Sequence, residues 1–315
     1  ARPVVTEDFV FAEPWGFHLR SGDPKTRAHP VTGEKVPWAF CRYNKQCGTF
    51  AGSRHFLFGR SRGVGYHDLF TDQGLYTILH SRSSCWVDTS SGGGTMIKPP
   101  SAIGCKCEVS MPFTFALAQV PTPLTLPQVF AQPGPVLPVK HLYIDFAATG
   151  DRRDKNGNLW LTVERQIGHK LLLGFNLTLE KYEGGKDVRR SSQYTRIEKT
   201  DTPFVFATAI QGLKSCVLPI TKPADGKGRY RVRLGFSALP GDKPGQRLFD
   251  VKLNGETVLT NFDILSEAAG PDQAIWKEFN LGIQGDLVLE LVAKAKMPSP
   301  QQMPLICGMQ VLRAD

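Results

Sequence analysis

Apolar and polar residues alternate along much of the C-terminal part of the chain. In segment 249–254, apolar Phe249, Val251 and Leu253 alternate with polar Asp250, Lys252 and Asn254. This is the pattern of a strand with one buried face. Asn254-Gly255 follows at once and predicts a tight hairpin turn. Similar short segments, separated by turn residues, lie at 230–239, 277–283, 285–295 and 305–312. The pattern predicts a β-sandwich that uses the loops at its ends for binding.

The first part of the chain, residues 1–119, also predicts short strands, rich in aromatic residues and glycine. Segment 120–139 then holds six prolines in twenty residues, which exclude a regular helix or a central strand. It predicts a semi-rigid extended linker that lies along a surface. We therefore expect three parts: a β region at 1–119, a proline-rich linker at 120–139 and a sandwich at 140–315.

The C-terminal segments resemble the malectin family. The resemblance rests on Tyr-x-Val-x-Leu-x-Phe at 230–236, Phe-Asp-Val-x-x-Asn-Gly at 249–255, Phe-Asp-Ile at 262–264 and the closing apolar strand at 305–312. It implies an all-β fold with a jelly-roll-type sandwich that binds carbohydrate through loop aromatics and an acidic residue. This chain has Ala238-Leu239-Pro240-Gly241 where the family has an aromatic pair, and no acidic residue at 299–302. The family's specificity for glucose oligomers is therefore not expected to transfer.

The first part resembles the end of a secreted bacterial quinoprotein-like β-propeller. The resemblance rests on the Thr-Gly turn followed by tryptophan at 31–38, Phe-x-Arg-Ser at 58–61, Gly-Tyr-x-Asp-Leu at 65–69 and three cysteine-bearing motifs at 47–49, 82–86 and 104–107. A blade takes about 40–50 residues and a closed propeller has about 4–8 blades, so this part supplies only a fraction of one. We expect that further blades of a longer protein or another protein chain complete it; an independent β unit held by its disulfides is the alternative. The resemblance implies pyrroloquinoline quinone as a cofactor only if those blades are present.

Composition and charge narrow the class of protein. Hydrophobic residues make up 41% and charged residues 21% of the 315 residues, which is ordinary for a globular protein of about two domains. The net charge is +9, but its basic residues are scattered, so we expect a solvated basic surface and no nucleic-acid partner. Attraction to acidic polysaccharide is the alternative interpretation.

No apolar run reaches the ~20 residues of a transmembrane segment. No signal peptide is visible, so we expect that a leader has been removed or that the chain is part of a longer one.

Five of the seven cysteines lie in the first 107 residues, and no Cys-x-x-Cys motif is present. This predicts disulfides in an oxidising compartment, with pairing among Cys47, Cys85, Cys105 and Cys107 and the connectivity left open. Cys216 and Cys307 fall in predicted strands and are expected to be buried thiols. We expect a secreted, periplasmic or cell-surface protein.

No catalytic motif stands out in the chain. It has no Gly-x-Ser-x-Gly, no His-Glu-x-x-His and no phosphate-binding glycine loop, and its seven histidines are isolated from one another. No catalytic residue is predicted, and this chain alone is not expected to be an enzyme.

The best polar cluster follows a strand that ends near Phe146. We expect a sugar-contacting loop here, with Asp151, Arg152, Asp154 and Asn156 as hydrogen-bonding residues. Aromatic residues for stacking on a sugar ring are predicted at four positions, each with a structural role as the alternative: Trp160, Tyr182, Tyr194 and Trp276.

Two other interpretations of this loop are open. The oxygen-rich spacing of Asp151, Asp154, Asn156 and Asn158 is compatible with Ca²⁺, although the neighbouring arginines oppose a cation. A turn held by salt bridges is the third interpretation.

The sequence therefore predicts a non-catalytic carbohydrate- or cell-surface-binding module, with a poly- or oligosaccharide as its partner. Two alternatives remain: the C-terminal part of a quinoprotein-like oxidoreductase whose catalytic blades lie outside this chain, and a structural subunit of an extracellular assembly.

Overall fold

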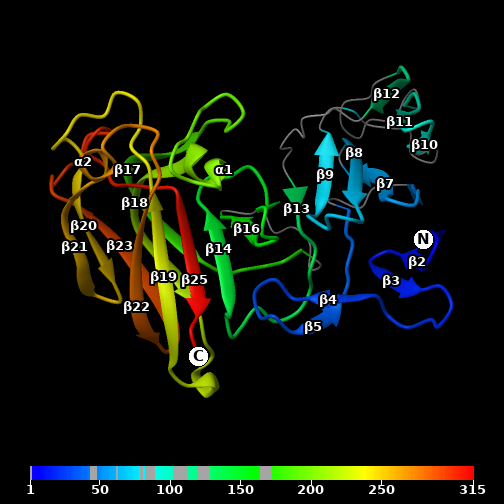
Figure 1. Cartoon of the computed structure of the whole chain (residues 1–315), viewed down its shortest axis with the longest axis horizontal. Helices are drawn as coiled ribbons and strands as arrows, with labels where there is room; N and C mark the ends of the chain where they lie inside the picture. The colour runs from blue at the N-terminus through cyan, green and yellow to red at the C-terminus, as the bar shows by residue number, and fades with distance from the viewer. Residues whose placement is uncertain are drawn as a thin grey trace.

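The computed structural model describes residues 2–42, 48–61, 63–78, 81, 89–101, 112–118, 128–163 and 172–315. Strands dominate these ranges, and helix is confined to α1 (Pro203–Ala207), α2 (Ile264–Ala268) and the 3-10 turn at Pro223–Asp225. The predicted all-β class is confirmed (Figure 1).

Two sheets form the C-terminal sandwich. The first has six strands in the order β15 (Arg152–Arg153), β16 (Leu159–Thr162), β14 (His141–Asp145), β25 (Gly308–Arg313), β19 (Gly228–Phe236) and β22 (Ile275–Ile283). The second has the order β17 (Thr178–Arg189), β18 (Thr208–Pro219), β23 (Asp286–Ala293), β20 (Leu248–Leu253) and β21 (Glu256–Asp263), with β24 (Leu305–Ile306) beside β18. All these pairings are antiparallel except that of β14 with β16.

The alternation in the sequence decides which face of each strand is buried. On β19, Val232 and Leu234 are fully buried in the core between the sheets, whereas Arg231 points outward and is exposed. The predicted hairpin joins β20 to β21, and Asn254 and Gly255 both have positive φ, as a tight turn of this type requires. The apolar faces of the two sheets thus form one continuous core.

Two glycines let bulky groups lie against the outward face of the first sheet. A Cβ on Gly308 would lie 2.4 Å from Val205 of α1, and one on Gly235 would lie 2.8 Å from the Trp276 ring. Both distances are too short for a side chain, so glycine at these positions permits α1 and Trp276 to pack directly on the strands.

The first part of the chain consists of small antiparallel sheets. They are β1–β3 (Val4–Val5, Phe9–Ala12, Trp15–His18), β4–β5 (Thr26–Ala28, Lys35–Pro37), β10–β12 (Ser90–Gly92, Thr95–Lys98, Phe115–Ala118) and a sheet of β6–β9 (Phe50–Gly52, Phe56–Ser61, Gly63–Asp68, Leu75–Ile78) with β13 (Gln128–Val129) at its edge. The described strands form no closed ring of blades, so the fold does not show the propeller that the resemblance implies.

The first part packs directly on the sandwich. Within the predicted linker, β13 pairs with β9, and Phe130, Ala131 and Val139 are buried. Val31, from the loop between β4 and β5, belongs to the sandwich core, and its carbonyl accepts hydrogen bonds from the backbone N–H groups of Lys140 and His141. The described part of the linker is therefore extended and held at a packed junction.

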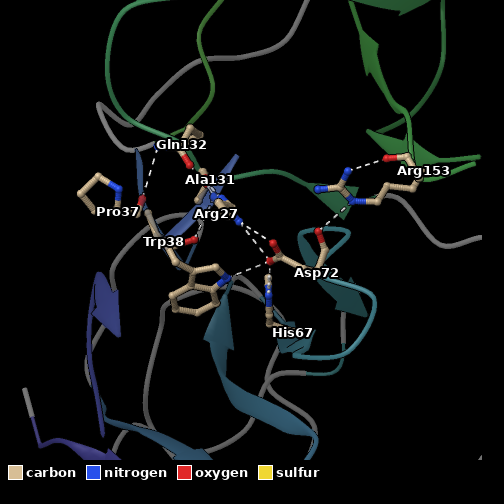
Figure 2. A network of polar contacts seen from close by, with 10 residues as sticks. Arg27, Pro37, Trp38, His67, Asp72, Ala131, Gln132 and Arg153 are labelled. Carbon is tan, nitrogen blue, oxygen red and sulfur yellow. Dashed lines mark hydrogen bonds and ion pairs between the residues drawn. The ribbon is translucent and has the colours of Figure 1, made fainter. Parts of the chain in front are cut away.

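A polar network stabilises this junction (Figure 2). The Asp72 carboxylate accepts hydrogen bonds from Arg27 (3.0 Å to each oxygen) and from Trp38 Nε1 (3.0 Å), and it pairs with His67 Nε2 at 3.1 Å. Arg153 of β15 donates to the backbone carbonyl of Asp72 at 3.1 Å. The network thus links two sheets of the first part, β4–β5 and β6–β9, to the sandwich.

The cysteine predictions have different outcomes. Cys47, Cys85, Cys105 and Cys107 lie outside the described residues. Cys216 and Cys307 are buried free thiols, as predicted, and burial raises the pKa of each to about 12.

In the ranges that the structure covers, no helix is long and apolar enough to span a membrane.

Candidate functional site

A polar pocket of about 180 Å³ opens at one end of the sandwich, where strand ends of both sheets meet α1. This volume is below the roughly 300–1,000 Å³ of pockets that enclose a small molecule, so it suits one sugar unit or a charged group of a larger ligand. The pocket is lined by residues from the end of β14 and the loop after it, from β15, from the end of β17 and the loop after it, from α1 and from the start of β18. These residues are Asp145, Ala148, Thr149, Gly150, Arg152, Arg189, Arg190, Ser191, Ser192, Phe204 and Thr208.

Asp145 is the one acidic side chain among the described residues that line the pocket. It is only 4% exposed, and the Thr208 hydroxyl donates a hydrogen bond to its Oδ1. Burial raises the pKa of Asp145 to about 7, although the Thr208 hydrogen bond and the nearby Arg152 charge oppose the shift. No donor from the described ranges hydrogen-bonds Oδ2. Near neutral pH this carboxyl group can therefore either accept a hydrogen bond from a ligand or donate one.

Three arginines give the pocket a positive charge. The Arg152 guanidinium lies 4.7 Å from the centre of the Phe204 ring. Arg189 donates to the Ala147 carbonyl at 2.7 Å and pairs with Asp187, and Arg190 pairs with Asp272 at 2.6 Å. The Nε and Nη2 groups of Arg190 are buried and have no hydrogen-bond partner within the described structure. Guanidinium groups that line a pocket favour a ligand with carboxylate or other anionic oxygens.

Aromatic residues support one wall of the pocket. Phe204 lines it and contacts Trp160 edge-on, with ring centres 6.2 Å apart. Trp160 is 1% exposed, so it supports the wall from below and has no face open for a sugar. Tyr194 is 89% exposed, and its backbone N–H donates to Ser191 of the pocket lining, which places Tyr194 beside the rim.

The two aspartates predicted as ligands mainly organise the loop itself. Buried Asp151 accepts hydrogen bonds from the backbone N–H groups of Phe130 (2.9 Å) and Thr162 (3.2 Å). Asp154 accepts from the backbone N–H groups of Asn156 and Asn158 and from Trp160 Nε1. Oxygens that accept N–H donors are poorly placed to bind Ca²⁺, and the covered ranges contain no group of three or more His, Cys, Asp or Glu side chains that could hold a metal ion.

The remaining predicted stacking residues lie on strands. The Tyr182 hydroxyl on β17 donates to the Leu291 carbonyl and accepts from the Ala293 N–H, both at 3.1 Å. Trp276 lies on the edge strand β22, with the Arg233 guanidinium 5.0 Å from its ring centre. Of the eight predicted sugar-contacting residues, the structure places Arg152 in the pocket and Tyr194 beside it. Sequence reasoning missed Asp145, Arg189, Arg190, Phe204 and Thr208. The adjacent Arg189 and Arg190 were the available signal, but they were counted among the scattered basic residues.

Comparison with known proteins identifies part of the sandwich. The family model of the malectin domain matches residues 168–299. This span includes Arg189, Arg190, Phe204 and Thr208, while Asp145 and Arg152 precede it. The malectin resemblance predicted from the sequence is therefore confirmed, and the comparisons do not show the quinoprotein resemblance of the first part.

Individual relatives cover only parts of the chain. A probable receptor-like protein kinase of Arabidopsis thaliana is 40% identical over 50 residues, which are 16% of this chain and 6% of that protein. The extracellular domain of ANXUR2 from Arabidopsis thaliana is similar in structure at a TM-score of 0.43 and 14% identity, covering 55% of this chain and 48% of that one. A Bacteroides uniformis β-glucuronidase has a TM-score of 0.44 and 12% identity, covering 99% of this chain and 28% of that one. The chain thus matches less than half the length of each of these proteins.

Proposed function

We propose that this protein is a non-catalytic, extracellular carbohydrate-binding module that holds an acidic sugar unit in the end pocket of its sandwich. The observation that carries the proposal is the pocket itself, where a nearly buried carboxyl group, three arginines and an aromatic wall converge. The malectin domain supports the carbohydrate class and the extracellular location.

Each pocket residue has a role that follows from its chemistry. Asp145 and the hydroxyls of Thr149 and Ser192 would hydrogen-bond sugar hydroxyls, and Phe204 would contact the apolar face of the ring. The arginines would bind the carboxylate of a uronic acid, because a planar guanidinium matches a carboxylate with two parallel hydrogen bonds. The net charge of +9 adds long-range attraction to an acidic polysaccharide.

Replacing Arg152 with Ala is expected to weaken binding of a galacturonic acid tetramer about tenfold, which is roughly 1.4 kcal/mol. The reason is the loss of one cation from the pocket, and isothermal titration calorimetry would measure it. Lys252→Ala removes the same charge from β20 of the other sheet and should leave the affinity unchanged. The proposal would be wrong if the tetramer and a neutral glucose tetramer both failed to bind the unmodified protein.

Assembly is a second candidate role. Strands β6 to β9 form an antiparallel four-stranded meander, the size of one propeller blade, and β6 has a pairing partner on one side only among the described strands. In this role the chain would join further blades or another chain, which would carry any quinone-dependent catalysis. Native mass spectrometry of the unreduced protein from its source would test this: a lone 34.8 kDa chain would argue against assembly, and a larger complex would support it.

A further inference from the structure

The outward face of the first sheet extends beyond the pocket along β14. On β14, Asp145 in the pocket is followed on the same face by Tyr143 and then His141, at about 6.6 Å per step along a strand. Tyr143 is in register with Gln310 of β25, which is in turn in register with Arg233 of β19. The next row along the sheet begins at His141 and continues through Leu312 to Arg231.

Aromatic contacts connect this face to the pocket wall. The Tyr143 ring centre lies 5.3 Å from that of Trp160, which also contacts Phe204 of the pocket. Tyr143 is half-buried, so it is held in place from below and keeps part of its surface open. A rigid ring of this kind is suited to stack on a sugar.

The face is positively charged. Arg229 and Arg231 are exposed on β19, and Arg233 lies on the same face of that strand. Glu278 pairs with Arg233. Arg231 has no hydrogen bond or ion pair to any described residue. Burial raises the pKa of the Tyr143 hydroxyl, and the charge of nearby Arg231 opposes part of this shift.

We propose that this face is a second binding subsite, which takes the next units of an acidic oligosaccharide whose first unit occupies the pocket. Tyr143 stacks on a sugar ring, and Arg231 binds the carboxylate of that unit or its neighbour. Charge complementarity and continuity with the pocket select an acidic glycan as the occupant. This inference rests on the proposed function, and it adds the direction of the bound chain and the length of ligand that the protein recognises.

Calorimetry with galacturonic acid oligomers of increasing length tests the proposal. We expect the hexamer to bind the unmodified protein at least about tenfold more tightly than the dimer, because only the longer chain contacts Tyr143 and Arg231 together. Tyr143→Ala and Arg231→Ala should remove this gain while the dimer affinity stays constant. Tyr143→Phe keeps the stacking ring and should retain the gain, and Lys252→Ala is the charge-matched control.

The outcomes separate the two proposals. Equal affinity for dimer and hexamer, or an unchanged hexamer affinity in Arg231→Ala, would overturn the second subsite and leave the pocket intact. Failure of every oligomer to bind would overturn both proposals. Arg231 is exposed on the sheet surface, so its variant should fold normally even if Tyr143→Ala is destabilised.

Discussion

Asp72→Ala is expected to lower the free energy of unfolding by about 3–5 kcal/mol, since it removes the acceptor at the centre of the junction network. Arg27 and His67 are largely buried, with 9% and 3% of their side chains exposed, and would lose their acidic partner together. The Trp38 indole N–H would also lose its acceptor. Urea unfolding followed by tryptophan fluorescence would measure the change, because Trp38 reports on this region directly.

The dependence of this effect on pH provides a second check. Burial raises the pKa of Asp72, but the hydrogen bond to His67 and the charge of Arg27 outweigh it and hold the pKa well below its ordinary value. For a carboxyl group with a depressed pKa, the stability it contributes is complete above the pKa of the unfolded chain and declines as the pH falls below about 4. The difference between the unmodified protein and Asp72→Asn should therefore be constant from pH 5 to 8 and shrink in acid. Asp8→Ala, at an exposed site, is the control, and an equal loss of stability in both variants would contradict the role of the network.

The sequence predicted the sandwich because some of its strands, such as β20, are buried on one face only. On β19 and β20 that burial imposes strict alternation, and Asn254-Gly255 fixes the hairpin through its own backbone preferences. The first part of the chain lacks such a signal. Its strands are short, and much of its order comes from side chains such as Arg27 and Asp72, which are 45 residues apart in sequence. Contacts of this kind leave no periodic pattern that a sequence can display.

The candidate site was harder to predict for a related reason. Sequence reasoning grouped residues 151–160 because they are polar neighbours in the chain, but most of their polar atoms hydrogen-bond within the loop or to adjoining backbone. The pocket instead combines Asp145 of one sheet with Arg189 and Thr208 of the other. Only the packing of the two sheets brings these residues together, and Arg152 belongs to both groups because β15 borders the pocket.

Asp145→Asn is expected to stabilise the protein at pH 8 and to have little effect at pH 4. Burial raises the pKa of Asp145 to about 7, so between about pH 4 and 7 the folded protein retains a proton that the unfolded chain has released. The unfolded state then binds fewer protons, and stability falls by about 1.4 kcal/mol per pH unit as the pH rises through this window. Asparagine carries no titratable proton and can still accept the Thr208 hydrogen bond. The variant should therefore gain on the order of 3–4 kcal/mol over the unmodified protein at pH 8, as measured by urea unfolding at a series of pH values.

The comparison must isolate Asp145 from other groups that titrate in the same window. Burial lowers the pKa of His29 to about 4, so His29 makes the folded protein less stable as the pH falls below about 6.5, which is the opposite trend. Both proteins contain His29, so its contribution cancels in the difference between them. Asp8→Asn, at an exposed carboxylate, should show no such pH-dependent difference. A constant stability difference between Asp145→Asn and the unmodified protein from pH 4 to 8 would mean that the Asp145 carboxyl group titrates near its ordinary pKa. Asp145 could then only accept hydrogen bonds from a ligand near pH 7, and its assigned ability to donate one would be wrong.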